Sequence, residues 1–458
     1  MSMGNHPKVY GTAAVAVAFV AGVLFTLGMK DFYPDLERRY QRRRGQPYNP
    51  LDSCPGSTYL TPLKLEDHSP SRHQSLVAPI VPEGIESTIG HTPLFKLKSL
   101  SEATGCEIFA KAEFLNGAGG SPKDRVALNM IAVAEEEGLL VPGRGDTIYE
   151  GTVGSTGISL ATLARAKGYQ AYICMPNDQS TEKSDLLHHL GATVERVTPA
   201  PITSTEHFVN LARRRAEEHT RNSKDGSVGF FADQFESMAN WKAHFSTTAP
   251  EIYEQMGGHI DAFVTGAGTG GTISGIAQYL KLETSLSTHI ILADPTGSGL
   301  YNKIKHNVMF ASTEREGTRR RQQVDTIVEG VGINRLTANF ASGMELIDDA
   351  VRVSDEQAFC MARWLVEKEG VFVGSSSAVN CVAAVVTALR MGGGKRVVTI
   401  LCDGGARHLS KFWKKVGERG LEEGGHDDLI KLLGVEGERT GERAEEKEEE
   451  KEEKKGEI

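Results

Sequence analysis

The hydrophobic pattern divides the chain into an apolar start, an irregular segment and a long regular part. Tyr10 to Met29 is a run of twenty uncharged residues, about the length that a helix needs to cross a bilayer. Residues 30–82 are rich in Pro, Ser and Arg and lack periodicity, which is typical of a linker. From Ile85 onward, short apolar segments alternate with amphipathic stretches, without an internal repeat. This alternation predicts parallel β-sheets covered by helices.

The apolar segments that predict strands are 147–150, 171–176, 262–266, 290–295 and 397–402. A helix is predicted after the turn GGSPKDR (119–125), with Ser121 as its N-cap and Pro122 at its first position. Lys123 then lies in the first turn, where a cation opposes the helix dipole. Lys123 is therefore either a solvated lysine beside a tight turn or a catalytic residue.

Charge and cysteine content exclude several classes of function. The net charge is −9, and 11 Glu against 6 Lys or Arg place −5 of it in residues 436–458, an expected disordered tail. Apart from the short run 319–321, the sequence shows no cluster of basic residues that would indicate nucleic-acid binding. Six scattered cysteines without a CxxC pair indicate neither a disulfide framework nor a metal site.

The charges around the apolar start favour a retained anchor over a cleaved signal peptide. Only Lys8 precedes the run, whereas Arg38, Arg39 and residues 42–44 follow it, which reverses the charge order of a signal peptide. The positive-inside rule leaves the large domain in the cytosol. The moderate hydrophobicity and the basic flank suggest a single-pass protein of the mitochondrial outer membrane, with the endoplasmic reticulum membrane as the alternative.

A glycine-rich turn between a predicted strand and helix forms a candidate phosphate site. The stretch 264–280 reads VTGAGTGGTISGIAQYL, and glycine at such a junction lets the backbone approach an anion at the helix N-terminus. The same spacing satisfies G-x-G-x-x-G, and Asp294 follows at the end of the next predicted strand. A nicotinamide-dependent oxidoreductase is therefore the main rival enzyme class.

A second glycine turn, in the stretch 149–164, distinguishes these two interpretations. Its N–H groups and the hydroxyls of Thr152, Ser155 and Thr156 are suited to a carboxylate. A dehydrogenase leaves this second turn unexplained. A small phosphorylated cofactor together with an amino-acid carboxylate would use both turns, with Lys123 between them.

The chain from Ile85 to Trp413 resembles the cysteine synthase and cystathionine β-synthase family of pyridoxal-phosphate enzymes. The motifs occur in the family's order: IGHTPL (89–94), KAEFLNGAGGSPKDR (111–125), GSTGISLA (154–161), DQFESMANWKAHFSTTAPEI (233–252), GTGGTISG (268–275), VEGVG (328–332) and VGSSSA (373–378). The resemblance implies pyridoxal 5'-phosphate as cofactor, a homodimer, and the two-domain α/β fold of the tryptophan-synthase-β type (fold type II).

The resemblance also implies a role for each matching residue. Lys123 would form the Schiff base with the cofactor and, once released, remove the substrate's α-proton. The phosphate would be bound by Gly268, Thr269, Gly270, Gly271 and Thr272. The substrate carboxylate would be held by Thr152, Gly154, Thr156 and Gln234, and Gly330 would line the mouth of the site.

Two cofactor-contacting positions depart from the family pattern. Ser155 stands where Asn usually faces the ring hydroxyl, and Gly404 stands where Ser often lies beside the ring nitrogen. Asp403 is expected to point elsewhere, which would leave water or the Cys402 thiol near that nitrogen. Otherwise Gly404 and Gly405 shape a turn that needs positive φ. A haem bound by Cys54 with His68 or His73 is disfavoured, because these residues lie in the linker.

The expected function is synthesis of cysteine from O-acetylserine and sulfide. Cysteine desulfhydrase, serine or threonine dehydratase and cystathionine β-synthase activities are the alternatives within the same chemistry. An anchored scaffold or sensor without turnover is the alternative of another class. The expected boundaries are 1–29 for the anchor, 30–82 for the linker, 83–122 with 245–425 for the larger cofactor-binding domain, 123–244 for the smaller domain and 426–458 for the tail.

Overall fold

The computed structural model describes residues 83–177, 181–310, 326–419 and 428–438, and in these ranges the strands form two sheets. The six-stranded sheet has the order β1 (Leu94–Lys96), β2 (Glu107–Ala112), β10 (Arg396–Leu401), β7 (Ala262–Gly266), β8 (His289–Pro295) and β9 (Asp349–Val353). Only the β1–β2 pair is antiparallel in this sheet. The four-stranded sheet, β5 (Thr193–Val197), β4 (Gln170–Pro176), β3 (Thr147–Gly151) and β6 (Gly229–Phe231), is parallel throughout.

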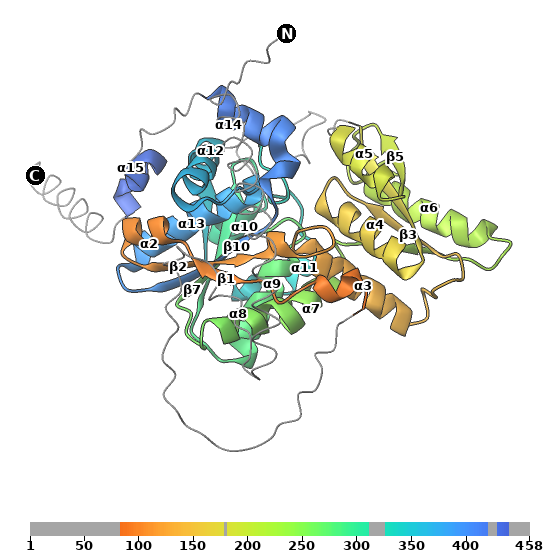
Figure 1. Ribbon diagram of the computed structural model, residues 1–458, viewed down its shortest axis with the longest axis horizontal. Helices are drawn as coiled ribbons and strands as arrows, with labels where there is room; N and C mark the ends of the chain where they lie inside the picture. The colour runs from red at the N-terminus through yellow and green to blue at the C-terminus, as the bar shows by residue number, and fades with distance from the viewer. Residues whose placement is uncertain (1–82, 178–180, 311–325, 420–427, 439–458) are drawn as a thin grey trace, which may run out of the picture. The chain divides into compact units, whose positions relative to one another are not determined.

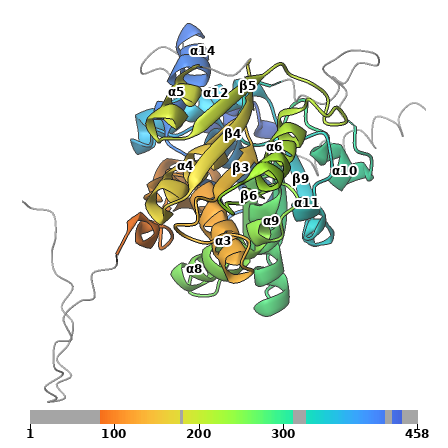
Figure 2. The same cartoon turned by 90° about the vertical axis from the view of Figure 1, so that its right-hand side faces the viewer.

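Helices cover both sheets, as the alternating pattern predicts. The described α-helices are α2 (Lys98–Thr104), α3 (Lys123–Glu136), α4 (Ser155–Lys167), α5 (Thr181–His189), α6 (Phe208–Asn222), α7 (Ala239–Ala243), α8 (Ala249–Gln255), α9 (Gly271–Gln278), α10 (Leu300–His306), α11 (Ala338–Ala341), α12 (Asp355–Trp364), α13 (Ser375–Met391), α14 (Lys414–Glu418) and α15 (Leu429–Leu433). Figures 1 and 2 show α4, α5 and α6 gathered around the four-stranded sheet. A π-helical turn, His244–Thr248, joins α7 to α8 without a break.

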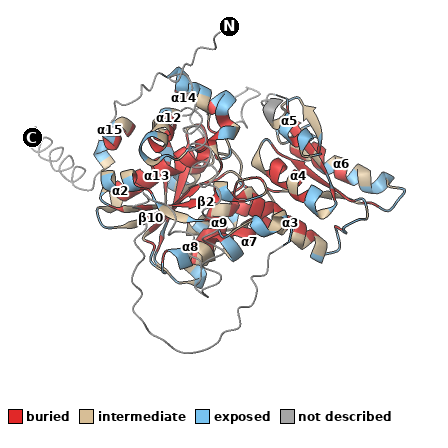
Figure 3. Ribbon diagram, viewed as in Figure 1, coloured by how far each residue is buried: buried red, intermediate tan, exposed pale blue. Residues whose placement is uncertain are grey.

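The core of each sheet is built from apolar side chains at the sheet–helix interface. Helix α13 packs against β7 and β10 and is buried from Ser375 to Leu389. Such all-round burial suits its small and apolar composition, because a helix surrounded by protein has no solvent-facing stripe. Figure 3 shows buried residues along the strands and along α13, with exposed residues on the outer helices. The two sheets are therefore fixed scaffolds for the loops at their edges.

The five predicted strands are confirmed as β3, β4, β7, β8 and β10, with end differences of one residue. Helix α3 begins at Lys123, one residue later than predicted, because Pro122 is the N-cap rather than the first helical residue. The Ser121 hydroxyl still caps this end and accepts the Lys123 N–H at 3.2 Å.

No helix in the described ranges is both long and apolar enough to cross a membrane. The predicted anchor and linker, residues 1–82, lie outside the described residues, and so do Cys54, His68 and His73.

Candidate active site

The residues predicted for the site follow the carboxyl ends of strands in both sheets. Residues 152–156 follow β3, Gln234 follows β6, residues 268–272 follow β7 and residues 402–404 follow β10. Lys123 is reached from β2 through a short 3-10 turn and the glycine turn. Parallel strands collect such loops at one edge of a sheet, which is where α/β proteins bind ligands. The fold thus places these predicted positions at edges of the sheets where α/β proteins bind ligands.

Lys123 is a half-buried lysine at the start of α3. Burial lowers the pKa of its amine, while the nearby groups of Cys402, Asp403 and Glu113 oppose this shift. Among the described residues its ammonium group has no hydrogen-bond or ion-pair partner. A lysine with these properties is available as a nucleophile or base, and it lies close to the end of β10.

The glycine loop after β7 is shaped by close backbone packing. Gly270 has φ +87° and caps α9, and a Cβ there would lie 2.4 Å from Phe340. A Cβ on Gly268 would lie 2.4 Å from the Gly330 carbonyl oxygen, so the loop contacts the predicted mouth of the site. The first N–H groups of α9 lack intrahelical partners and can bind an anion.

Two side chains that the sequence reasoning missed fix the hydroxyls of this loop. The buried Asn240 amide donates to the Thr269 hydroxyl at 2.9 Å, and its Oδ1 has no hydrogen-bond partner among the described residues. His244 Nε2 lies 3.2 Å from the Thr272 hydroxyl. Burial holds the pKa of His244 well below its ordinary value, and the charges of Lys123 and Arg125 act in the same direction. His244 therefore lies near Lys123 and also contacts the glycine loop through Thr272.

The loop that is predicted to bind the substrate opens α4, with Gly154 as the N-cap of the helix. Thr156 donates from its hydroxyl to Gln234 Oε1 at 2.5 Å, so two residues predicted to hold a carboxylate are in direct contact. The Thr152 hydroxyl accepts the Gly154 N–H at 3.3 Å. The structure therefore brings the four predicted substrate residues together around one helix N-terminus.

The segment after β10 presents a pair that the sequence reasoning missed. The Asp403 carboxylate accepts from His408 Nε2 at 3.0 Å and from the Ser155 hydroxyl at 3.5 Å. His408 was absent from the prediction because the sequence offers no motif at that spacing. Burial raises the pKa of the Cys402 thiol to about 11, so it is protonated at neutral pH.

Gly404 does not need the positive φ that the turn interpretation requires. Its backbone is extended, with φ −76° and ψ 148°, and Gly405 is also absent from the residues of positive φ. The turn interpretation is therefore wrong at these two glycines. Gly404 instead pairs with Val373 in an isolated antiparallel bridge.

Gly330, which is predicted to line the mouth of the site, directly follows the ion-paired Glu329. Gly330 has φ +86°, which favours glycine, and Glu329 accepts from Lys183 Nζ at 2.7 Å and from Lys411 Nζ at 3.2 Å. Lys183 belongs to α5, beside the four-stranded sheet, so this ion pair joins α5 to the segment that contains Gly330.

Comparison with known proteins agrees with this geometry. A family model described as pyridoxal-phosphate dependent enzyme matches residues 85–403. Cysteine synthase 2 of Neurospora crassa is 66% identical over 95% of this chain and 99% of its own length. A Saccharomyces cerevisiae relative, provisionally named a mitochondrial cysteine synthase, is 53% identical over 73% of this chain and 85% of its own. The crystal structure of an O-ureido-L-serine synthase superposes with a TM-score of 0.62 at 29% identity, covering 77% of this chain and 99% of the other.

The chain belongs to the family of pyridoxal-phosphate dependent enzymes. The resemblance inferred from the motifs is confirmed, and so is the cofactor. The nicotinamide interpretation is wrong. Asp294 is buried, and its carboxylate accepts the Tyr301 N–H at 2.7 Å inside the protein.

Proposed function

We propose that the protein is a cysteine synthase that converts O-acetylserine and sulfide to cysteine and acetate. The observation that carries the proposal is the unpartnered, half-buried amine of Lys123, which lies in the part of the fold where two helix N-termini can bind anions. The high identity to a cysteine synthase over nearly the whole chain supports the same reaction.

The described residues fit pyridoxal phosphate. The α9 N-terminus and the hydroxyls of Thr269 and Thr272 would bind the phosphate, and Lys123 would hold the aldehyde. Ser155 and the segment Cys402–Gly404 would face the ring. When bound, the cofactor supplies an electron sink for the negative charge that develops at the substrate's Cα.

The protein's own groups bind the substrate and move the proton. Thr152, Thr156 and Gln234 would hold the substrate carboxylate, aided by the N–H groups that open α4. The Lys123 amine removes the Cα proton, and its lowered pKa increases the neutral fraction that can act as a base. The half-buried and protonated Cys402 thiol lies close to Lys123, whereas Asp403 accepts a hydrogen bond from His408. We expect the ring nitrogen to be met by water or by Cys402.

The reaction is tested by supplying candidate substrates to the purified full-length protein. O-acetylserine with sulfide should yield cysteine and acetate faster than serine, threonine or cysteine yields any product. Release of sulfide from cysteine as the dominant reaction would identify a desulfhydrase. Production of keto acid from serine or threonine would identify a dehydratase. Cystathionine formation from serine and homocysteine would identify a cystathionine β-synthase, and a colourless protein without turnover would support the scaffold alternative.

We further propose that residues 1–29 anchor a homodimer to the mitochondrial outer membrane, with the catalytic part in the cytosol. The twenty-residue apolar run with its basic C-terminal flank supports the anchor. The provisional mitochondrial name of the yeast relative supports the organelle. In this proposal the two sheets belong to two domains, with 123–244 as the smaller and 83–122 with 245–425 as the larger. The tail predicted from residue 426 is wrong at its start, because α15 is ordered and its Leu429, Ile430 and Leu433 are buried in the core of the larger domain.

A further inference from the structure

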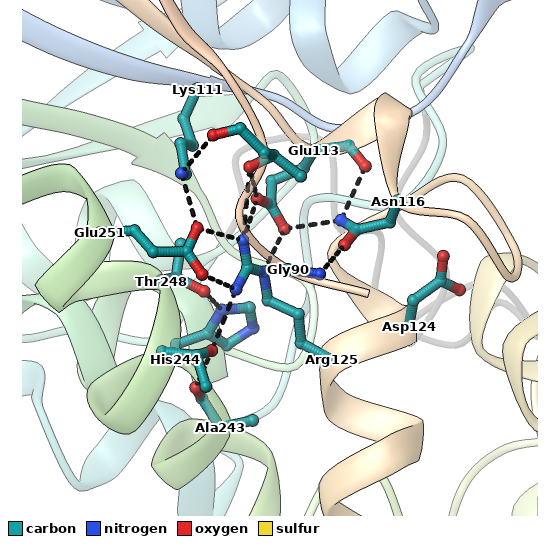
Figure 4. Close-up of polar contacts among 12 residues, drawn as sticks. Gly90, Lys111, Glu113, Asn116, Asp124, Arg125, Ala243, His244, Thr248 and Glu251 are labelled. Atoms are coloured by element: carbon teal, nitrogen blue, oxygen red, sulfur yellow. Dashed lines mark hydrogen bonds and ion pairs between the residues drawn. The ribbon is translucent and has the colours of Figure 1, made fainter. Parts of the chain in front are cut away.

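The two charged residues directly after Lys123 are both buried, and the proposed reaction gives neither of them a role. Asp124 is fully buried and Arg125 is 3% exposed. Burying an unpaired charge costs several kcal/mol. The partners of Asp124 and Arg125 therefore indicate which structural role these two residues have. In Figure 4 Arg125 points into a cluster of charged side chains, whereas Asp124 points away from it.

Arg125 forms two-pronged ion pairs with two carboxylates at once. Its Nε and one terminal nitrogen donate to Glu113 at 2.8 and 2.9 Å. Both terminal nitrogens donate to Glu251 at 2.7 Å. Glu113 follows β2 and Glu251 lies on α8, so one guanidinium fixes the start of α3 to two separate elements (Figure 4).

The charges of this cluster balance. Lys111 donates from its buried ammonium to Glu251 at 2.7 Å, which gives two cations against two carboxylates. Arg125 holds the pKa of Glu251 down at about 2 even though burial alone would raise it, so Glu251 is ionised at neutral pH. A planar guanidinium can engage two carboxylates in this way, but a lysine ammonium cannot.

Asp124 fixes the same turn of α3 on its other side. Its two carboxylate oxygens accept the Gly119 N–H at 2.7 and 2.8 Å, and its Oδ1 accepts the Ser159 hydroxyl at 2.5 Å. Ser159 lies on α4, one turn after the substrate loop. A Cβ on Gly119 would lie 2.6 Å from Asp124 Oδ1, so the glycine of the turn permits this approach.

We propose that Asp124 and Arg125 are positioning residues, which hold the first turn of α3 so that the Lys123 amine reaches the cofactor. Arg125 fixes that turn to β2 and α8, and Asp124 fixes it to the glycine turn and to α4. The inference rests on the proposed function, because it takes Lys123 as the cofactor lysine.

A positioning role differs from a contribution to stability in what it changes. Loss of a buried ion pair lowers the stability of the fold wherever the pair lies. Displacement of a reacting group by about 1 Å can lower the rate by about 100-fold. Only a change at α3 should therefore alter the environment of the lysine-bound cofactor.

The test compares the same substitution at two arginines in the full-length holoenzyme. Arg125→Lys keeps the charge but cannot engage both carboxylates. Arg144→Lys is the matched control, because Arg144 makes a two-pronged pair with the buried Asp146 at the opposite, amino end of β3.

Glu251→Gln serves as a second variant if Arg125→Lys does not accumulate. Asp124→Asn tests the other contact, because its amide keeps only one acceptor oxygen. The measurements are Tm, kcat, and the pH midpoint of the absorbance band of the lysine-bound cofactor.

We expect Arg125→Lys and Asp124→Asn to lower kcat at least about tenfold and to move the absorbance midpoint by about half a pH unit or more. Arg144→Lys should lower Tm without moving the midpoint. Rate and midpoint that stay unchanged in Arg125→Lys, or that change equally in Arg144→Lys at equal loss of Tm, would overturn the inference alone. A Lys123→Ala protein that keeps the lysine-bound absorbance band would instead overturn the assignment of Lys123, and the inference with it.

Discussion

Gly404, which stands where the family often has Ser, occupies a position with no steric need for glycine. Its extended backbone suits any residue, and no atom lies within 4 Å of the position where a Cβ would stand. Gly404→Ser should therefore change the free energy of unfolding by no more than about 0.5 kcal/mol and should preserve turnover.

Gly405 provides the matched control for that substitution. A Cβ there would lie 2.7 Å from the Phe372 ring, so Gly405→Ser should cost about 1–3 kcal/mol through overpacking. Thermal melts and steady-state rates on both variants check this contrast. Equal destabilisation by the two substitutions would show that Gly404 is required for the turn.

Glu150 couples the stability of the fold to pH. It lies next to residues that are predicted to bind the substrate. It is fully buried at the end of β3, and burial raises the pKa of its carboxyl from 4.5 to about 8. The folded protein therefore holds a proton that the unfolded chain releases. The contribution of Glu150 to the free energy of unfolding is fully present below pH 4.5 and is lost as pH rises through 8.

Glu150→Gln removes this dependence, because its side chain is neutral at every pH. The stability of the variant relative to wild type should increase between pH 5 and 8 by an amount on the order of a few kcal/mol. Thermal melts across that range measure the difference. A stability difference that does not vary with pH would mean that Glu150 is ionised in the folded protein.

Among the elements, α5 forms an ion pair with Glu329, the neighbour of Gly330, which is predicted to line the mouth of the site. The Lys183 and Glu329 side chains are 16% and 20% exposed, so their attraction is partly screened by solvent. Lys183→Met should raise the KM for O-acetylserine up to about fivefold with little change in kcat, because an ion pair of this kind contributes up to about 1 kcal/mol.

Salt and a distant ion pair provide the controls for α5. Added salt should move the wild-type KM toward that of Lys183→Met, because salt screens exposed charges. Lys281→Met removes a comparable pair with Asp348, 2.6 Å apart at the amino end of β9, and should leave KM unchanged. Identical KM values for wild type and Lys183→Met at every salt concentration would contradict a role for α5 at the mouth.

The sequence predicts the elements whose apolar pattern is local and continuous. The buried strands β3, β7 and β10 are such runs, and the glycine turns after β3 and β7 mark two ligand-binding loops. Strands β1 and β6 have three residues each, and β5 is partly exposed along most of its length, so none of them has a recognisable period.

The partners of the site residues could not be predicted in the same way. Arg125 and Glu251 are 126 positions apart, and Ser155 and Asp403 are 248 apart. Only tertiary packing brings such pairs together, and no local pattern encodes it. The motifs therefore predict the candidate site residues, and the structure shows which distant residues contact them.

For the whole molecule, the anchor is the part of the account that rests on sequence alone. Deletion of residues 1–45 removes the apolar run and its basic flank and should release a soluble, active enzyme. Carbonate extraction and protease protection on isolated mitochondria measure attachment and topology. Full-length protein that extracts freely, or a catalytic part protected by an intact outer membrane, would contradict the proposed location.

In the proposed mechanism the Lys123 amine holds the cofactor and performs the proton transfer. Borohydride reduction of the holoenzyme, followed by peptide mapping, identifies the lysine that holds the cofactor, because reduction fixes the cofactor to the lysine that carries it. We predict a pyridoxyl label on Lys123 alone, and neither label nor turnover in Lys123→Ala. A label on any other lysine, or a Lys123→Ala protein that still forms cysteine at the wild-type rate, would contradict the account.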